Sequence, residues 1–293
     1  MKEYEVIKGY RDDPALRGSF NALAGKTFGL DFEGWYRNGY WTDKYNPYSI
    51  LIDGEIAANV SVNRTDFLWN NQRKHLIQLG TVMTEEKYRG QGLIRRIMEE
   101  IDRDYSGRAE GIYLFANGNV LDLYPRFGFR REEEVLYTKR VAADREKSGD
   151  SMVKIPMEGK RDWDRLEEVI RKSRSGSAFS LADNSELPMF YLTQFLKDNV
   201  YFCKELNVYA AARIKEGDLL LYDVFSEKDY DLHRVIGAFG REIRQVSLGF
   251  TPTDRSGFEA GIVQEEDTYL FVRGEGLDCF AAWGVRIPLL AYA

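Results

Sequence analysis

The segment YRGQGLIRRIMEEI, residues 88–101, carries the residues whose types and spacing best suit chemistry. Gly90 and Gly92 follow Arg89 and precede an amphipathic stretch, although glycine is a poor residue for a helix entry unless the backbone must bend or a ligand must come close to it. Free N–H groups in such a loop, with the partial positive charge of a helix N-terminus, suit a phosphate or pyrophosphate. A tight turn that only feeds a helix would use the same residues.

A second motif lies downstream, in NGNVLDLYPRFGFRR, residues 117–131. Asn117 is followed seven residues later by Tyr124 and then by Gly128-Phe129. The known nucleotide loops fit the glycine segment badly, because it has neither the Gly-Lys-Ser/Thr of a Walker motif nor the third glycine of a dinucleotide fold. Together the two segments resemble the signature of the Gcn5-related N-acetyltransferase (GNAT) superfamily: Arg/Gln-x-x-Gly-x-Gly/Ala, then Asn, Tyr and Gly-Phe. Ile94 departs from it, because a small residue is usual there.

The segment GTVMTEEKYRGQGL looks closest to two-domain bacterial members of the enhanced-intracellular-survival (Eis) type. The resemblance implies acetyl-coenzyme A as co-substrate and no metal. Glycines at 90 and 92 would let backbone amides wrap the pyrophosphate where a Cβ would collide. Backbone groups of the strand before the loop would bond the pantetheine amides and polarise the thioester carbonyl. The expected cofactor-binding residues are Val82, Met83, Thr84, Arg89, Gly90, Gln91, Gly92, Leu93, Ile94 and Asn117.

Tyr124 matches the superfamily's general acid. The reference pKa values, about 10 for tyrosine and about 8.5 for a thiol, make full proton transfer to the thiolate uphill by roughly 2 kcal/mol, so a hydrogen bond to sulfur is part of the expectation. Many members place a glutamate base about eleven residues before the arginine, where this chain has Gln78. The alternatives are Asp31, Glu33 or Asp43 in the N-terminal region, a water chain, or the carboxylate of Ala293, because members of the Eis type place their C-terminal carboxylate in the catalytic cleft.

The segment at residues 28–48 is rich in aromatic and acidic side chains. The corresponding region lines the acceptor pocket in the superfamily, and aromatic faces with carboxylates suit a cation such as a polyamine, an aminoglycoside-like amine or a lysine-type amine. The expected substrate-binding residues are Asp31, Glu33, Trp35, Tyr36 and Trp41. Equally, these aromatics could simply cover the sheet. A non-catalytic acetyl-coenzyme A sensor is the rival function.

The elements that must position these residues follow from periodicity. Residues 48–62 alternate around Asp53-Gly54 as a hairpin, and residues 75–84 and 111–117 form two further strands. The helix between these two strands has one apolar stripe, Leu93, Ile94, Ile97, Met98 and Ile101. A strand, loop, helix and strand in this order predict a parallel pair. We therefore expect an α+β protein with a mixed β-sheet flanked by helices, the acyl-CoA N-acyltransferase fold.

The second half repeats this order without the glycine loop: a hairpin at 200–214, a strand at 218–229, a helix at 231–243 and a strand at 245–252. The polar segment 142–150 is expected to link a catalytic domain, 1–141, to a second α+β domain, 151–293, which is either a degenerate GNAT-like repeat or an unrelated half.

Composition restricts the possible partners. A net charge of −6 with no basic run argues against nucleic acid, and two histidines and two cysteines argue against metal sites and disulfide frameworks. No apolar run reaches the length of about 18 residues that a membrane span needs, so the expected location is the cytoplasm. The expected partner is a small-molecule amine, and a homo-oligomer is possible.

Overall fold

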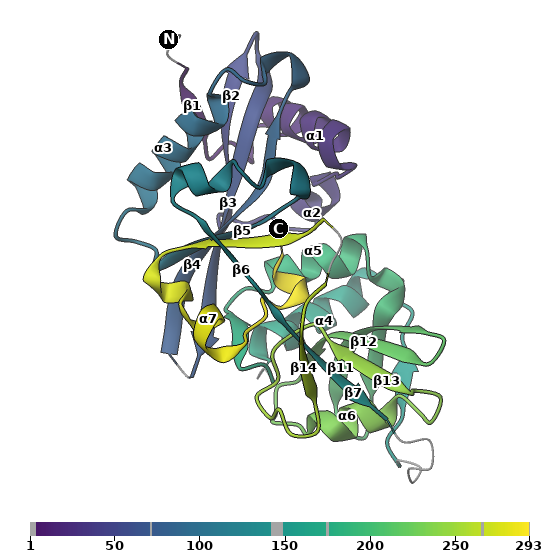
Figure 1. The fold of residues 1–293 in the computed structure, drawn as a ribbon. Helices are drawn as coiled ribbons and strands as arrows, with labels where there is room; N and C mark the ends of the chain where they lie inside the picture. Colours follow the sequence, from purple (N-terminus) through teal and green to yellow (C-terminus); the bar gives the residue numbers. More distant parts are fainter. Residues whose placement is uncertain (1–3, 71, 142–148, 174–175, 265–266, 293) are drawn as a thin grey trace.

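The computed structural model describes residues 4–70, 72–141, 149–173, 176–264 and 267–292, and Figure 1 shows two β-sheets with helices packed on them. The eight-stranded sheet has the order β1-β2-β3-β4-β5-β15-β6, with β9 paired to β3. Its strands are β1 Val6–Lys8, β2 Tyr45–Ile52, β3 Glu55–Trp69, β4 Gln72–Thr84, β5 Gly111–Ala116, β6 Arg130–Glu132, β9 Phe179–Ala182 and β15 Tyr269–Arg273.

The seven-stranded sheet has the order β14-β7-β13-β12-β11-β10-β8. Its strands are β7 Val135–Arg140, β8 Met152–Lys154, β10 Val200–Cys203, β11 Val208–Lys215, β12 Asp218–Phe225, β13 Gln245–Leu248 and β14 Glu259–Ile262. The α-helices are α1 Pro14–Phe28, α2 Glu33–Arg37, α3 Leu93–Tyr105, α4 Lys160–Lys172, α5 Glu186–Gln194, α6 Leu232–Ala238 and α7 Cys279–Trp283. None of the described helices is long and apolar enough to span a membrane.

The elements expected around the glycine loop are confirmed. The β2–β3 turn has positive φ at both Asp53 (55°) and Gly54 (82°), the conformation of a type I′ hairpin turn. Strands β4 and β5 pair in parallel, from Leu76 opposite Gly111 to Leu79 opposite Leu114. Helix α3 between them buries the apolar stripe read from the sequence, except for half-buried Ile94. The pattern of one strand, one amphipathic helix and a second strand therefore forms as periodicity requires.

The second half has the same strand order as the first. Strands β10, β11, β12 and β13 follow one another as β2, β3, β4 and β5 do, and β12 and β13 are again parallel. Helix α6 is shorter than the helix expected at 231–243, because it ends before Gly240, whose φ of 101° is incompatible with a helix.

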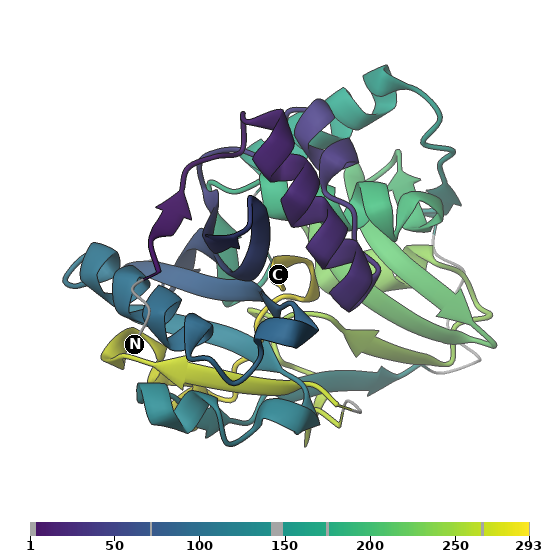
Figure 2. The same ribbon diagram turned by 90° about the horizontal axis from the view of Figure 1, so that it is seen from above.

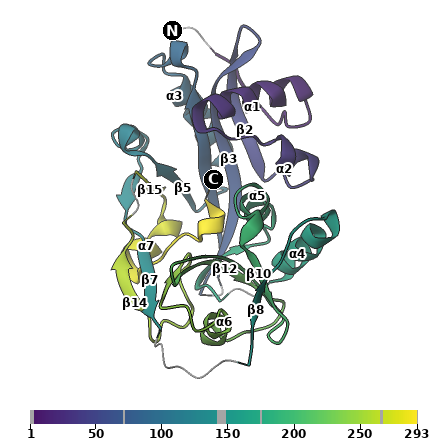
Figure 3. The same cartoon turned by 90° about the vertical axis from the view of Figure 1, so that its right-hand side faces the viewer.

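The two sheets exchange strands. Residues 135–140 (β7) pair with β13 of the second sheet, and residues 269–273 (β15) pair with β5 of the first. Figures 1 and 2 show the teal and yellow strands crossing between the halves, and Figure 3 shows β15 beside β5 while β7 and β14 lie with the second sheet. The expected domain division at residue 141, which stays a prediction, therefore does not coincide with the division between the sheets. Most of the expected linker, 142–148, lies outside the described residues.

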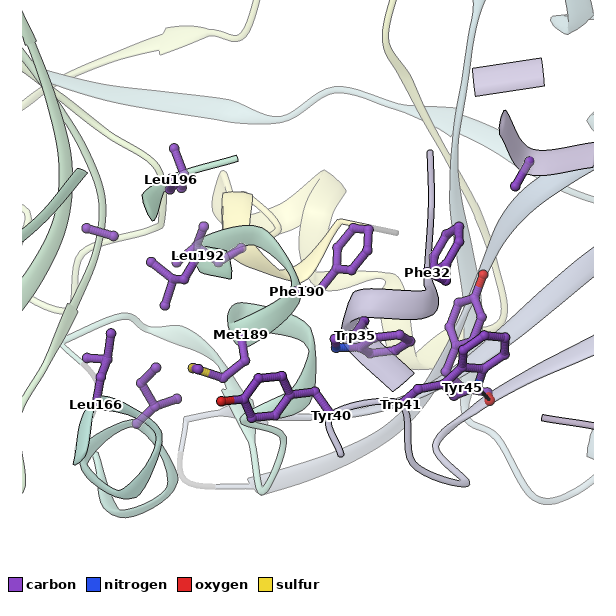
Figure 4. Close-up of a cluster of buried hydrophobic side chains, with 14 of the residues drawn as sticks. Phe32, Trp35, Tyr40, Trp41, Tyr45, Leu166, Met189, Phe190, Leu192 and Leu196 are labelled. Atoms are coloured by element: carbon purple, nitrogen blue, oxygen red, sulfur yellow. Dashed lines mark hydrogen bonds between the residues drawn. The ribbon is translucent and has the colours of Figure 1, made fainter. Parts of the chain in front are cut away.

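A shared core joins the halves. Helices α1 and α2 of the first half and α4 and α5 of the second contribute to one cluster of buried side chains, part of which is shown in Figure 4. Phe32 stacks on Phe190 with ring centroids 5.3 Å apart, and Trp35 meets the same Phe190 at 5.4 Å. Burial of this aromatic surface fixes α5 beside α2.

Candidate active site

The loop before α3 has an unusual backbone conformation. Gly90 and Gly92 have φ of 75° and 79°, in the left-handed region that side chains other than glycine rarely adopt. No described residue lies within 4 Å of a Cβ placed at either glycine, so open space lies over the loop. The protein's own geometry therefore requires glycine for the backbone angle, while any close approach would come from a ligand.

The N-terminus of α3 is open to an anion. Gly92 occupies the N-cap position, and no side chain caps this helix of 13 residues. The corresponding helix of the second half, α6, differs, because the Asp231 carboxylate accepts hydrogen bonds from the backbone N–H groups of His233 (2.8 Å) and Arg234 (3.3 Å). An acidic cap occupies the site that an anion would use. Of these two helices, only α3 has an N-terminus that is not capped by an acidic side chain.

Strands β4 and β5 diverge next to this loop. Their pairing ends at Leu79 and Leu114, whereas β4 continues to Thr84 with β3 as its neighbour on the other side. The edge of β4 that faces β5 is thus released from the ladder over its last residues. Backbone groups along such an edge are available to a bound molecule.

A bulge bends β4 where the divergence begins. The β3–β4 register shifts between Asn59 and Ser61, and Thr81 has a φ of 47°, which is costly for a β-branched residue. The fully buried Asn59 supports this bulge by donating from Nδ2 to the carbonyl oxygen of Thr81 (2.9 Å) and to Oγ of Ser61 (2.9 Å).

Two neighbours complete this network. Ser49 Oγ donates to Oδ1 of Asn59 over 2.8 Å, and the hydroxyls of Tyr45 and Thr81 are hydrogen-bonded. A strained residue persists only where its surroundings over-determine it.

A cavity of about 370 Å³ lies beside the bulge, in the gap between the diverging strands. Its walls come from both halves: the segment between α1 and α2, strands β2, β4 and β5, the turns after β5, and helix α5 with Phe195. All lining side chains are uncharged: Phe28, Leu30, Phe32, Trp35, Tyr45, Leu79, Gly80, Thr81, Val82, Phe115, Ala116, Asn117, Val120, Leu123, Tyr124, Leu187, Phe190, Tyr191 and Phe195.

Tyr124 lies in the wall of this cavity and is 4% exposed. It begins a short 3-10 helix, Tyr124–Phe127, and its ring packs against Phe271 of β15 at 5.5 Å and against Phe129 at 6.1 Å. Burial raises the pKa of the Tyr124 phenol to about 12. The hydroxyl is therefore a hydrogen-bond donor at every physiological pH.

The other expected cofactor-binding residues surround the same gap. Val82 lines the cavity, and so does Asn117, whose Oδ1 accepts from the Asn119 backbone N–H (3.2 Å). Arg89 is exposed, and its Nε donates to the Thr84 carbonyl oxygen at 3.4 Å. The side chains of Met83 and Leu93 are buried in the core, which leaves only their backbone groups for a ligand, and the exposed Gln91 and half-buried Ile94 lie in the loop and first turn.

The expected acceptor residues are only partly at the cavity. Trp35 lines it, but Trp41 is 3% exposed and its Nε1 donates to the Tyr45 carbonyl oxygen. Tyr36 has the Arg17 guanidinium over its ring at 3.7 Å, and Glu33 accepts from Arg17 (2.8 Å) and Arg37 (2.9 Å).

The acidic candidates likewise have structural partners. Asp31 accepts from the Glu33 backbone N–H, and Asp43 pairs with Arg64 at 2.9 Å. Asp31, Glu33, Tyr36 and Trp41 are not among the residues that line the cavity, and the contacts described above lie within the first half of the chain, so their role in substrate binding stays a prediction.

Asp31, Glu33 and Asp43, the described candidates for the base, lie outside the cavity lining, and so does Gln78. Gln78 is fully buried, and its Oε1 accepts from the Tyr113 hydroxyl at 3.5 Å. Ala293 lies outside the described residues. The last described side chain, Tyr292, stacks on the cavity residue Phe115 with centroids 3.8 Å apart.

Several wall residues had no sequence signal that marked them. Phe190, Tyr191 and Phe195 come from the α5 region, about a hundred residues from the glycine loop in the sequence. Asn59, which supports the bulge, lies within the apolar run IAANVSV, and its polar side chain in that run is its only signal in the sequence. The described residues contain no group of three or more His, Cys, Asp or Glu side chains arranged to hold a metal ion.

The equivalent gap in the second half is filled by the chain itself. The Gly249 N–H donates to the Leu221 carbonyl oxygen at 2.7 Å, and the Leu289 N–H donates to the Gly249 carbonyl oxygen at 2.8 Å. A Cβ at Gly249 would lie 3.0 Å from the Leu289 side chain. The C-terminal segment thus occupies the position that is open between β4 and β5.

Comparison with known proteins agrees with this geometry. Residues 16–131 match the family model described as an acetyltransferase (GNAT) domain. No curated protein matches the chain. The fold is similar to that of a probable N-acyltransferase from Enterococcus faecalis, with a TM-score of 0.61, 15% identity, and coverage of 95% of this chain and 74% of that one.

Two further solved structures share this fold. Eis1 from Mycobacterium abscessus has a TM-score of 0.58 at 14% identity, over 92% of this chain and 72% of that one. A GCN5-related N-acetyltransferase from Kribbella flavida also has a TM-score of 0.58, at 16% identity, over 97% of this chain and 74% of that one. Residues 16–131 therefore match a GNAT acetyltransferase domain, and the chain shares the two-sheet fold of these solved structures.

Proposed function

We propose that this protein transfers an acetyl group from acetyl-coenzyme A to a primary amine by direct attack of the amine on the thioester. One observation carries the proposal: after its pairing with β5 ends, strand β4 lines the cavity with Tyr124 at residues 79–82 and then leads to the loop before the uncapped N-terminus of α3. An extended donor with an anionic group and a reactive end would suit this arrangement.

The donor would be held mainly by backbone groups. Amides of the loop from Arg89 to Ile94 would bind the pyrophosphate, because the glycine conformations turn N–H groups outward and the helix terminus adds positive charge. The free edge of β4 over Val82, Met83 and Thr84 would bond the pantetheine amides. Asn117, at the end of β5, would contact the donor from the side opposite β4.

At the reacting end, a backbone N–H at the Thr81 bulge would polarise the thioester carbonyl as an oxyanion hole. The Tyr124 hydroxyl would donate a hydrogen bond to the departing sulfur. Complete proton transfer from a phenol with a pKa near 12 to a thiolate with the reference value of about 8.5 is uphill by roughly 5 kcal/mol. Tyr124 therefore works as a hydrogen-bond donor, and the thiolate takes its proton in a later step.

A thermal-shift experiment tests the donor site. Acetyl-coenzyme A at 100 times its dissociation constant adds about 2.7 kcal/mol to the free energy of unfolding, which raises the Tm of a protein of this length by about 4 °C. Gly92→Glu should abolish this rise by placing a carboxylate at the anion site. Gly92→Ala is the matched control, because it imposes the same left-handed strain without the charge.

Release of free thiol in the presence of an amine tests the reaction itself.

In the thermal-shift experiment, equal loss of the Tm rise in Gly92→Ala and Gly92→Glu would attribute the effect to backbone strain. No rise in the native chain would refute the donor site.

A non-catalytic acetyl-coenzyme A sensor is the second candidate. Buried Gln78 favours it, because it stands where many superfamily members have a glutamate base. A sensor would show the Tm rise and release no thiol with any amine.

A further inference from the structure

We propose that the acceptor is a primary amine with an apolar substituent and no second positive charge. The inference rests on the proposed acetyl transfer and names its substrate class. It replaces the cationic acceptor expected from the composition of residues 28–48.

The first argument is the absence of charge from the cavity. None of the described residues that line it is Asp, Glu, Lys, Arg or His. The carboxylates nearest in sequence are engaged elsewhere: Glu33 with Arg17 and Arg37, and Asp43 with Arg64. A second ammonium group on the acceptor would lose its hydration and find no counter-ion among the described residues that line the cavity.

The second argument is that aromatic neighbours stack on Phe32 and Trp35 in the cavity wall. Phe32 is stacked against both Tyr45 (5.7 Å, 21°) and Phe190 (5.3 Å, 14°), as Figure 4 shows for the labelled side chains. Trp35 is stacked against Trp41 at 5.9 Å. A cation–π site needs a free ring face, so the cavity presents these aromatics as an apolar wall.

The third argument is the exposure of two aromatic side chains at the cavity. Phe28 is 45% exposed and Phe195 is 53% exposed, and both line this same cavity, one from the first half and one from the second. Apolar surface left in water at a binding site is stabilised when a ligand covers it. An alkyl or aryl substituent on the amine would cover both rings.

The uncharged wall also helps the chemistry. Transfer of an ammonium group into such a cavity lowers the pKa of that group, so the neutral, nucleophilic amine is favoured. The amine nitrogen gives its lone pair to the carbonyl carbon, the C–S bond breaks, and its electron pair leaves with the sulfur. The proton lost from nitrogen balances the proton finally gained by the thiolate. This route needs no carboxylate base in the cavity.

Hexylamine and 1,5-diaminopentane test the proposal, because they are isosteric and differ only in a terminal methyl or ammonium group. We expect kcat/KM for hexylamine to exceed that for the diamine by about tenfold or more, equivalent to 1.4 kcal/mol. Thiol release is measured at one pH with saturating acetyl-coenzyme A. A ratio of one or less overturns the proposal.

Phe195→Asp tests whether this cavity sets the preference. A carboxylate at its edge should lower the hexylamine to diamine ratio about tenfold, as a free-energy change of 1.4 kcal/mol would. Ile262→Asp is the matched control, because Ile262 is 49% exposed and lies on β14, outside the cavity lining. An unchanged ratio in Phe195→Asp, or the same fall in Ile262→Asp, assigns the preference elsewhere and overturns the proposal.

Failure of the inference and failure of the proposed function look different. A Tm rise with acetyl-coenzyme A, together with turnover of the diamine in preference to hexylamine, retains the acetyltransferase and refutes the apolar acceptor. A Tm rise without turnover of either amine refutes the apolar acceptor and favours the sensor. The absence of both a Tm rise and turnover removes the donor site and this inference with it.

Discussion

Replacing Asn59 with alanine should remove the hydrogen bonds that stabilise the β4 bulge. Asn59 makes three buried hydrogen bonds: from Nδ2 to the Thr81 carbonyl oxygen (2.9 Å) and Ser61 Oγ (2.9 Å), and to Oδ1 from Ser49 Oγ (2.8 Å). Thr81 is held at a φ of 47° partly by the first of them. Without that bond, the backbone of Thr81 can relax towards an ordinary extended conformation.

The cost follows from these contacts. Each buried hydrogen bond contributes about 1 kcal/mol, so Asn59→Ala should lose about 3 kcal/mol of folding free energy beyond the effect of the smaller side chain. Asn63→Ala provides that reference, since Asn63 is also buried on β3 and its Nδ2 has no hydrogen-bond partner among the described residues. The two variants delete the same atoms from the same strand.

Urea unfolding measures the free-energy difference between the two variants, and kcat measures its functional effect at a temperature where both are folded. If the bulge aims the oxyanion-hole amide, kcat should fall about 100-fold in Asn59→Ala and change little in Asn63→Ala. Equal destabilisation and equal kcat in the two variants would refute the supporting role of Asn59.

Three further predictions concern titratable side chains. Tyr124→Phe should lower kcat by about 100-fold with KM for the amine nearly unchanged, as steady-state thiol release would show. Because burial raises the Tyr124 pKa to about 12, kcat/KM should rise with pH as the amine loses its proton and should not fall before about pH 10. A hydrogen bond from Arg17 lowers the pKa of Glu33 in the folded protein. The ionised Glu33 therefore stabilises the fold above the pKa of the unfolded chain, about 4.3, and this stability is lost as pH falls through the lower folded pKa. Glu33→Gln should reduce the fall of Tm at acidic pH in thermal melts without changing KM.

The conformation of the glycine loop, of α3 and of the strands beside it could be predicted because it depends on local rules. A positive φ at Gly90 and Gly92 is a property that glycine supplies wherever it stands. The apolar residues of α3 recur at helical spacing. Two strands joined by a helix in one sheet form a parallel pair, as β4 and β5 do. The spacing from Asn117 to Tyr124 lies within one connected turn region, so both reach the same wall.

The surroundings of residues 28–48 could not be predicted in the same way. Trp35 packs against Phe190 of α5, which comes from residues 186–194, and it also lines the cavity. Trp41 is buried against Phe20 and Tyr45 and does not line the cavity. The carboxylates that suggested a cation are held by Arg17, Arg37 and Arg64. Which side of an aromatic helix faces a ligand depends on what packs against the other side.

The glycine turn, the amphipathic helix, the parallel strands and the position of Tyr124 follow from the conformational preferences or periodicity of neighbouring residues. The exchange of β7 and β15, the closing of the second gap by the segment at Leu289, and the uncharged wall from α5 depend on how distant segments pack. These features join segments about 40 to more than 150 residues apart. Their free energy comes from surfaces that meet only after folding, and no local pattern records which surfaces will meet.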